Sequence, residues 1–343
     1  MTTKIAINGF GRIGRAAFKA ALENKNLEVV AINDLMDIKM LAHLLQYDSV
    51  YGQYEKSVIP TREGVKVQGK LYPVFGEKDP GKLPWKKLKV DVVLECTGVF
   101  RSKKDAGGHL AAGAKQVIIS APAKDNATET LILGTKDSDD RLKKGKTDQV
   151  VSMASCTTNC ISPVIDVLAS RFGIEKAMMT TVHSYTADQN LVDGPHQSDF
   201  RRARAAAFNI VPTSTGAAIA TTKVVKGLDK MFDGIALRVP TICGSISDIT
   251  AVLKRKKVTV KQINDAFKKA VKDPIFKKVL AVTNKPLVSS DIIGNCYSSV
   301  VDLEFTKVVG GNLVKVLAWY DNEWAYSLRL TEMAEALGKS LNK

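Results

Sequence analysis

A glycine-rich segment near the amino terminus constrains the fold more than any other part of the chain. Gly9-Phe10-Gly11-Arg12-Ile13-Gly14 has the spacing G-x-G-x-x-G and follows a short apolar run at residues 4–8. Residues 11–23 then place apolar side chains at helical intervals. In such a strand–turn–helix unit Gly9 permits the tight turn, Gly11 lets the backbone approach a pyrophosphate, and Gly14 lets the helix pack closely. The segment therefore predicts a dinucleotide-binding site at the start of the helix.

The end of the second expected strand indicates which dinucleotide binds. Residues 27–33 form another apolar run, and Asp34 follows it directly. A carboxylate in this place accepts hydrogen bonds from the adenosine ribose and repels a 2′-phosphate, so Asp34 favours NAD over NADP. Further strands expected at 91–95 and 116–120 flank a helical stretch near 102–112. This alternation predicts an α/β fold with a doubly wound parallel sheet of the Rossmann type.

The pattern changes after about residue 150. A helix expected at 156–172 and a strand at 177–184 precede a loop over 185–212 that is rich in Gly, Pro and Arg. Long strands with few helices between them follow, which favours a mainly antiparallel sheet. We therefore expect an NAD-binding domain over residues 1–154, joined by a C-terminal helix at 323–343, and an α+β catalytic domain over 155–322.

Composition excludes several classes of protein. The 343 residues suffice for two cores, and fractions of 45% hydrophobic and 25% charged residues are ordinary for globular proteins. No run of about 18 predominantly apolar residues occurs, and the first residues lack the pattern of a signal peptide. Five scattered cysteines do not form a disulfide framework. We expect a cytoplasmic protein without a membrane segment.

The charge of the chain leaves two interpretations open. There are 50 basic and 35 acidic residues, a net charge of +15 that is spread over both halves. The densest basic run, at 254–257, is followed by more lysines in a helix expected at 260–271. Such a run forms either a solvated helix face or a surface that binds polyanions. A broadly positive field also attracts phosphorylated metabolites.

Two side chains are candidates for a nucleophilic pair. Cys156 lies in Ser155-Cys156-Thr157-Thr158-Asn159-Cys160, where a loop meets a helix and the helix dipole stabilises a thiolate. Cys160, one turn further on, is expected to be more buried and a poorer nucleophile. His183 ends the strand at 177–184, from which it can reach into a cleft and activate a thiol. The structural alternatives are small buried hydrophobes for the cysteines and a packing residue for the histidine.

The other histidines carry no comparable signal. His43 and His109 lie within helical patterns and are expected to be surface or packing residues. No spacing of cysteine and histidine resembles a metal site, so we expect none.

Basic and hydroxyl residues later in the chain favour an anion-rich substrate. Arg201 and Arg202 lie in the long loop, Thr215-Gly216 precedes a helix, and Arg238 ends a strand. Hydroxyls, N–H groups at helix starts and forked guanidinium groups suit phosphate binding. Each of these residues alone is more often a helix cap or a surface charge.

Taken together, the motifs resemble those of the phosphorylating glyceraldehyde-3-phosphate dehydrogenase family over essentially the whole chain. Besides the segments above, the resemblance rests on Thr97-Gly98-Val99-Phe100, Thr181-Val182-His183-Ser184-Tyr185-Thr186 and Trp319-Tyr320-Asp321-Asn322-Glu323-Trp324. Two positions depart from the family pattern. Cys96 stands where Ser is common, and Ala325 stands where Gly is usual, but neither change removes a catalytic group.

The resemblance implies an activity and a set of site residues. The reaction is oxidation of D-glyceraldehyde 3-phosphate to 1,3-bisphosphoglycerate with NAD and inorganic phosphate, in glycolysis and gluconeogenesis. Cys156 is the nucleophile that forms a thiohemiacetal and then a thioester, and His183 is its base. Substrate-phosphate contacts fall on Thr186 and Arg238. Contacts to inorganic phosphate fall on Ser155, Thr157, Thr215, Gly216 and Arg202, with the choice between Arg201 and Arg202 left open.

The resemblance also implies cofactor contacts and an assembly. Contacts to NAD fall on Arg12, Ile13, Asp34, Lys78, Ser120 and Asn322, in addition to Gly9, Gly11 and Gly14. The family is homotetrameric, with the 185–212 loop buried between subunits near the cofactor. Two alternatives remain: a sister enzyme that acts on erythrose 4-phosphate, and a nucleic-acid-binding secondary role, for which no signature with interleaved aromatic residues is present.

Overall fold

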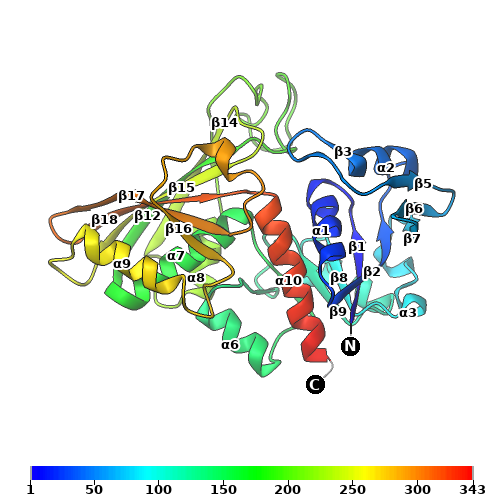
Figure 1. Ribbon diagram of the computed structural model, residues 1–343, viewed down its shortest axis with the longest axis horizontal. Helices are drawn as coiled ribbons and strands as arrows, with labels where there is room; N and C mark the ends of the chain where they lie inside the picture. The colour runs from blue at the N-terminus through cyan, green and yellow to red at the C-terminus, as the bar shows by residue number, and fades with distance from the viewer. Residues whose placement is uncertain (1, 342–343) are drawn as a thin grey trace. The chain divides into compact units, whose positions relative to one another are not determined.

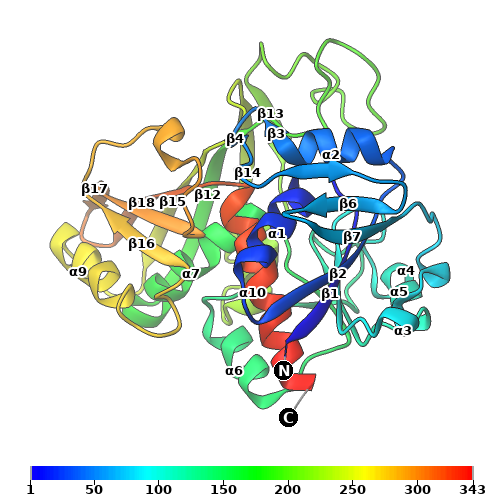
Figure 2. The same cartoon turned by 45° about the vertical axis from the view of Figure 1, so that its right-hand side comes forward.

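A computed structural model describes residues 2–341, and the chain divides into two compact units (Figures 1 and 2). Unit 1 contains the residues up to 131, residues 140–154 and those from 326 onward, and unit 2 contains residues 132–139 and 155–325. Residues 342–343 of the expected C-terminal helix lie outside the described residues. Within residues 2–341, no helix has the length and apolar character that a membrane span requires.

The sheet of unit 1 has the strand order β10-β11-β9-β8-β1-β2-β7-β6-β5. Pairing is parallel from β10 to β7 and antiparallel only in the β5–β6–β7 meander. The strands are β1 (Thr3–Asn8), β2 (Leu27–Asn33), β5 (Val58–Pro60), β6 (Gly64–Val67), β7 (Lys70–Phe75), β8 (Val92–Glu95), β9 (Gln116–Ile119), β10 (Glu129–Thr130) and β11 (Val150–Ser152). The chain leaves β1 in one direction and returns to its other side, so the carboxyl end of β1 is a switch point where ligands bind. The predicted Rossmann-type sheet is confirmed.

Helices pack on both faces of this sheet. Alternate residues of β1 point to opposite faces: Ala6 joins a buried cluster with Trp85, whereas Ile7 lies beside Gly14 of α1. The long helix α10 returns to β1, where a Cβ on Gly338 would lie 2.1 Å from Thr3 Oγ1. The helices that contribute to unit 1 are α1 (Arg12–Glu23), α2 (Ile38–Gln46), η1 (Pro80–Lys82), α3 (Trp85–Leu88), α4 (Lys103–Ala106), α5 (Gly108–Ala111), part of α6 (Lys136–Lys144) and most of α10 (Trp324–Leu341).

The sheet of unit 2 has the order β13-β14-β12-β15-β18-β17-β16. Its strands are β12 (Ile174–Ser184), β13 (Val211–Ser214), β14 (Phe232–Val239), β15 (Ser245–Leu253), β16 (Leu280–Thr283), β17 (Ser299–Val309) and β18 (Leu313–Tyr320). Most pairs are antiparallel, as predicted. The pairs β12–β14 and β16–β17 are parallel, and the first of these positions the candidate site.

Helices cover one face of the unit 2 sheet. Figure 1 shows α7 (Cys156–Phe172), α8 (Ala217–Val224) and α9 (Val260–Ala270) on the same side of the strands. In β15 buried and half-buried residues alternate strictly, as expected for a strand with one covered face. The opposite face carries exposed apolar side chains, among them Met178 and Ile235. Short elements complete the fold: the β3 (Tyr47–Asp48) and β4 (Gly52–Gln53) hairpin and η2 (Ser289–Ile292).

Candidate active site

Cys156 is the first residue of α7, and local chemistry fixes the start of that helix. Ser155 is the N-cap: its hydroxyl accepts a hydrogen bond from the N–H of Thr158 at 3.0 Å, and Thr158 completes a capping box. Ala154, just before the cap, has a positive φ of 52°, which is uncommon for a residue with a side chain. This turn places the thiol where the unpaired N–H groups of the helix begin.

His183 lies close to this thiol, as the sequence predicted. It is the last residue but one of β12, and its Nε2 is 3.4 Å from Cys156 Sγ. A contact of this length between an imidazole and a thiol is a hydrogen bond. The pair is therefore arranged for proton transfer from sulfur to nitrogen.

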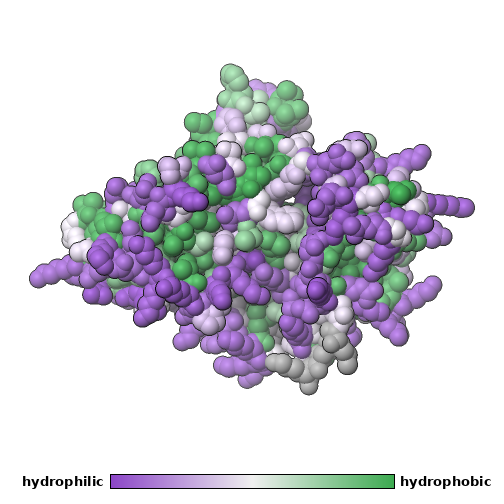
Figure 3. Space-filling model, viewed as in Figure 1, coloured by the Kyte–Doolittle hydropathy of each residue, from purple (hydrophilic) through white to green (hydrophobic). Residues whose placement is uncertain are grey.

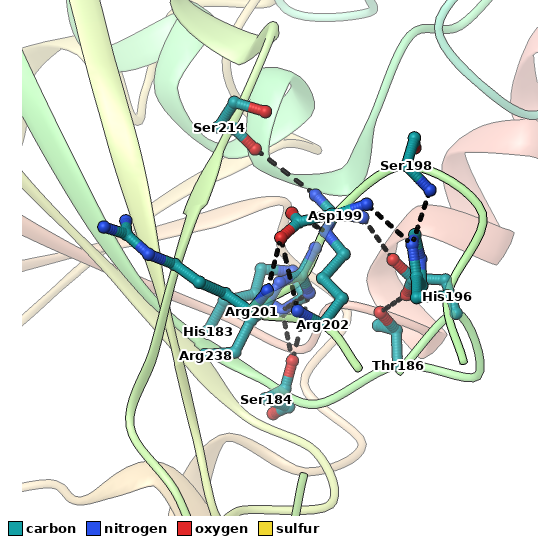
Figure 4. Close-up of polar contacts among 11 residues, drawn as sticks. His183, Ser184, Thr186, His196, Ser198, Asp199, Arg201, Arg202, Ser214 and Arg238 are labelled. Atoms are coloured by element: carbon teal, nitrogen blue, oxygen red, sulfur yellow. Dashed lines mark hydrogen bonds and ion pairs between the residues drawn. The ribbon is translucent and has the colours of Figure 1, made fainter. Parts of the chain in front are cut away.

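Arg238 orients the imidazole from the other side. Parallel pairing of β12 with β14 sets His183 opposite Arg238. His183 Nδ1 is 2.7 Å from the carbonyl oxygen of Ser184, and Arg238 Nη1 lies 3.1 Å from the same oxygen (Figure 4). Arg238 Nη1 also lies 2.7 Å from His183 Nδ1. We assign the ring proton to Nδ1, because the carbonyl oxygen of Ser184 can only accept and both the imidazole and the guanidinium then donate to it. This tautomer leaves the lone pair of Nε2 directed at Cys156.

Burial acts on the protonation of both members of the pair. It raises the pKa of the Cys156 thiol, and this effect is opposed by the guanidinium of Arg238 and by the N–H of Thr157. Burial and the same guanidinium lower the pKa of His183. The sequence predicted a thiolate stabilised by the helix dipole. In the structure burial acts against that thiolate, so the thiol depends on the adjacent imidazole as its proton acceptor.

Cys160 does not share this environment. It is fully buried, and its Sγ is 3.8 Å from both Ser299 Oγ and the carbonyl oxygen of Ala318. Burial raises the pKa of its thiol to about 12. A buried thiol that ionises so reluctantly is a poor nucleophile, which agrees with the prediction.

Tyr320 is a residue of the site that sequence reasoning missed. Its buried hydroxyl is 2.9 Å from Thr157 Oγ1 and 2.8 Å from Thr181 Oγ1, and its ring meets the ring of His183 edge-on. The phenol thus holds both the residue after the nucleophile and the strand that carries the base. Its position in the Trp319–Trp324 segment was visible, but its partners lie far away in the sequence.

The candidate phosphate ligands fall into separate groups. Ser155 and Thr157 flank Cys156, and Arg238 adjoins His183, so these three surround the nucleophilic pair. Thr215 and Gly216 precede α8, and the hydroxyl of Thr215 accepts a hydrogen bond from Ala217 N. Thr186 instead donates to Asp188 in the loop after β12.

Arg202 and Arg201 differ in their partners. The guanidinium of Arg202 is ion-paired with both Asp188 and Asp199, and it also reaches the carbonyl oxygen of Ser214 (Figure 4). Among the described residues, the Arg201 guanidinium has no hydrogen bond or ion pair. Both arginines line a cavity of about 580 Å³ together with His196, Ser198, Asp199, Phe200, Pro212, Thr213 and Ser214.

The three glycines of the G-x-G-x-x-G segment have distinct surroundings. Gly9 has φ +91°, and a Cβ there would lie 2.6 Å from the backbone nitrogen of Thr97. A Cβ on Gly14 would lie 2.0 Å from the carbonyl oxygen of Gly9, so it permits the close helix packing that was predicted. Nothing lies within 4 Å of the Cβ position of Gly11, which leaves its backbone open to a ligand.

Gly9, Gly11, Asp34 and Lys78 line one pocket of about 400 Å³ in unit 1. The other lining residues are Asn8, Asn33, Leu35, Glu77, Cys96, Thr97, Val99 and Phe100. None of these was assigned a contact with the cofactor from the sequence, because the strand ends on which they lie meet only in the folded sheet. The carboxylate of Asp34 accepts hydrogen bonds from Phe10 N and Met36 N. A pocket with apolar walls, one fixed carboxylate and an open helix start fits the adenosine half of a dinucleotide.

The remaining candidate cofactor residues lie outside that pocket. Ile13 follows Arg12 in α1, and the guanidinium of Arg12 pairs with Asp48. Ser120 follows β9 in unit 1. Asn322 belongs to unit 2, where its Oδ1 accepts hydrogen bonds from Gly244 N and Ser245 Oγ. Over residues 2–341, no cluster of three or more His, Cys, Asp or Glu side chains is arranged to hold a metal ion.

Comparison with known proteins gives matches over both units. The family model for the NAD binding domain of glyceraldehyde 3-phosphate dehydrogenase matches residues 3–103, and that for the C-terminal domain matches residues 155–322. Glyceraldehyde-3-phosphate dehydrogenase of Borreliella burgdorferi is 50% identical over 341 residues, which cover 98% of this chain and 100% of the relative. Glyceraldehyde-3-phosphate dehydrogenase 1 of Bacillus subtilis is 49% identical over 339 residues, which cover 99% of each.

Replacing His183 by Asn removes the acceptor for the Cys156 proton. In the unaltered protein the imidazole of His183 lies 3.4 Å from the thiol and accepts its proton, so thiolate forms without release of the proton to solvent. In the variant the thiol has no neighbouring acceptor and must ionise to solvent, which burial opposes because it raises the pKa of Cys156. We expect alkylation of Cys156 by iodoacetamide to be much slower at pH 7 and to rise about tenfold per pH unit.

Peptide mass spectrometry measures this alkylation at Cys156 directly. His43→Asn is the matched control, because His43 is exposed on α2 in unit 1. Equal rates in His183→Asn and the unaltered protein at pH 7 would show that the imidazole does not take the thiol proton.

Proposed function

The chain belongs to the glyceraldehyde-3-phosphate dehydrogenase family, and from this premise we propose that Cys156 and His183 carry out the reaction of that family. The protein is an NAD-dependent oxidoreductase that acts on D-glyceraldehyde 3-phosphate in glycolysis. The observation that carries the residue assignment is the 3.4 Å contact between Cys156 Sγ and His183 Nε2. No observation favours the alternatives, erythrose 4-phosphate oxidation and nucleic-acid binding.

The first step is addition of sulfur to the aldehyde. His183 Nε2 takes the thiol proton, and Cys156 Sγ bonds to the carbonyl carbon to give a thiohemiacetal. Negative charge that develops on the former carbonyl oxygen is stabilised by N–H groups at the start of α7 and by a proton from His183. Ser155 contributes by holding that helix start in place through its cap.

Oxidation then converts the thiohemiacetal to a thioester. His183 removes the hydroxyl proton as the carbon gives up hydride. NAD, which Gly9, Gly11, Asp34 and Lys78 would hold, would supply the hydride acceptor. Because sulfur is a good leaving group, the thioester keeps the free energy of oxidation available for transfer to inorganic phosphate. A phosphate oxygen attacks the acyl carbon, the carbon–sulfur bond breaks, and 1,3-bisphosphoglycerate leaves.

The phosphate groups require cations and N–H donors around the pair. We assign the substrate phosphate to Thr186 and Arg238, and inorganic phosphate to Ser155, Thr157, Thr215 and Gly216. Of the two loop arginines, Arg202 is neutralised by two carboxylates, whereas Arg201 has its charge available to an anion. This difference favours Arg201 over Arg202 as the phosphate ligand.

Exposed apolar surface supports a homotetramer. The uncovered face of the unit 2 sheet presents Met178, Ile235 and Phe305. The loop between β12 and β13 exposes Phe200 by 94% and Phe208 by 86%, and Figure 3 shows hydrophobic atoms at its tip, at the top of the view. Patches of this kind mark protein–protein contacts. We place the assembly in the cytoplasm because the described cysteines form no disulfide with one another.

Cys156→Ser tests the proposed nucleophile. A hydroxyl is a weaker nucleophile and a poorer leaving group than sulfur, so we expect NADH formation to fall by about 10⁴-fold or more. Absorbance at the NADH band, with and without phosphate, measures the effect. Cys160→Ser is the matched control and retains turnover. NADH production undiminished in Cys156→Ser would refute the mechanism.

Asp34→Asn tests the basis of cofactor choice. The amide removes the charge that repels a 2′-phosphate but keeps an oxygen that can accept a hydrogen bond from Phe10 N or Met36 N. We expect the ratio of kcat/KM for NAD to that for NADP to fall by about tenfold or more. Steady-state rates with both cofactors measure the ratio. An unchanged ratio would mean that Asp34 does not exclude NADP.

Met178→Asp tests the proposed assembly. A carboxylate buried in an interface without a partner is strongly unfavourable, so we expect smaller species than in the unaltered protein. Light scattering coupled to size-exclusion chromatography measures the mass. Lys261→Asp, on the exposed helix α9, is the control and leaves the mass unchanged. A tetramer that persists in Met178→Asp would show that the interface between subunits does not include this face of the sheet.

A further inference from the structure

A buried carboxylate lies at the end of β8, behind the cofactor pocket of unit 1. Glu95 is 1% exposed, and four hydrogen-bond donors surround its carboxylate. Oε1 accepts hydrogen bonds from the backbone N–H of Thr97, at 2.8 Å, and from its hydroxyl. Oε2 lies 2.5 Å from Asn8 Nδ2 and 3.1 Å from His109 Nε2. A buried carboxylate with this many donors is fixed in one orientation.

The donors on Glu95 come from the loops that line the pocket. Asn8 ends β1, and Thr97 follows β8. The network continues from Asn8 Oδ1 to Asn33 Nδ2 at 2.7 Å, and Asn33 bonds both the N–H and the carbonyl oxygen of Glu77. This network of hydrogen bonds therefore links the ends of β8, β1, β2 and β7, which are the four segments around the pocket.

His109 closes the network on the side away from the pocket. Trp85 Nε1 is 2.9 Å from His109 Nδ1, and an indole nitrogen can only donate. His109 Nδ1 therefore accepts, its proton lies on Nε2, and that proton points at Glu95. Both His109 and Trp85 are fully buried. The sequence predicted His109 as a surface or packing residue. It is buried in the core and stacks on Trp85, as a packing residue does, and it is also a polar partner of Glu95.

We propose that Glu95 and His109 are positioning residues for NAD. Neither is assigned a contact with the cofactor: Glu95 holds the pocket walls through Asn8 and Thr97, and His109 holds Glu95. Close packing makes the arrangement sensitive, since the backbone of Thr97 lies against Gly9, where a Cβ would approach it to 2.6 Å. A shift of the Thr97 loop therefore moves the glycine turn at the start of α1. The proposal rests on NAD as the cofactor, and it locates its effect in the adenosine half.

Glu95→Gln tests the role of the carboxylate. The amide group of glutamine turns one acceptor into a donor, so it faces either the two donors of Thr97 or those of Asn8 and His109. We expect the dissociation constant for ADP-ribose, measured by calorimetry on the full-length protein, to rise about tenfold or more. ADP-ribose binding needs no turnover, so this readout is independent of the proposed catalytic residues.

Asp91→Asn provides the matched control. Asp91 precedes the same strand at its opposite end, where it pairs with Lys115 and accepts a hydrogen bond from the N–H of Lys4. Loss of this partly buried carboxylate lowers stability without touching the pocket. We expect ADP-ribose affinity in Asp91→Asn to stay within about twofold of the unaltered protein. If Glu95→Gln does not fold, Thr97→Val removes one of the same hydrogen bonds with little change in shape, together with the bond that Val99 N–H donates to the Thr97 hydroxyl.

A pair of His109 variants separates positioning from packing. Glutamine can donate to Glu95 from its Nε2 as the imidazole does, whereas leucine fills the space without a donor. We expect His109→Leu to weaken ADP-ribose binding about tenfold and His109→Gln to recover most of the affinity. In both, alkylation of Cys156 proceeds at the unaltered rate, because that residue belongs to unit 2.

The outcomes separate this proposal from the proposed function. Unchanged ADP-ribose affinity in folded Glu95→Gln, Thr97→Val and His109→Leu would overturn the positioning role while leaving Cys156 and His183 untouched. Equal loss in His109→Leu and His109→Gln would also overturn it, since packing alone would then explain the effect. Conversely, weakened ADP-ribose binding supports the proposal even if Cys156→Ser were to retain turnover.

Discussion

The proton-transfer contact between Cys156 and His183 forms where the ends of two secondary-structure elements meet. One is the start of α7, which Ser155 caps, and the other is the end of β12. Parallel pairing of β12 with β14 then brings Arg238 beside the same imidazole. If the helix began one residue later, or β12 slipped by one residue against β14, the sulfur, the ring or the guanidinium would point elsewhere. Because backbone pairing sets these positions, the reacting groups are held as rigidly as the sheet itself.

Signals that act over a few residues made most of the fold predictable. The apolar run before Gly9 and the helical spacing after it identify β1 and α1, because each depends on neighbours in the sequence. Ser155, just before Cys156, and Thr158, three residues later, likewise mark the helix start. The pairing of Cys156 with His183 was predictable because each lies at the end of a helix or strand. The expected helix at 102–112 is interrupted at Gly107, which separates α4 from α5.

Features that depend on distant partners were not predictable in this way. Tyr320 meets Thr157 across 163 positions of sequence, and Asn8 meets Glu95 across 87. No periodicity encodes such contacts, because they arise only when strand ends come together. The burial of the nucleophile was not predictable either: a helix dipole is visible in the sequence, whereas the burial that opposes ionisation of Cys156 is a property of the folded chain.

The order of segments along the chain bears on how the protein folds. The backbone passes between the two units four times, after residues 131, 139, 154 and 325. Helix α10 buries Leu330, Met333 and Leu337 completely and brings Gly338 against Thr3 of β1, although residues 155–325 of unit 2 separate it from the rest of unit 1. Completing the packing of unit 1 therefore requires contacts between segments that lie far apart in the chain, and contacts of this kind slow folding.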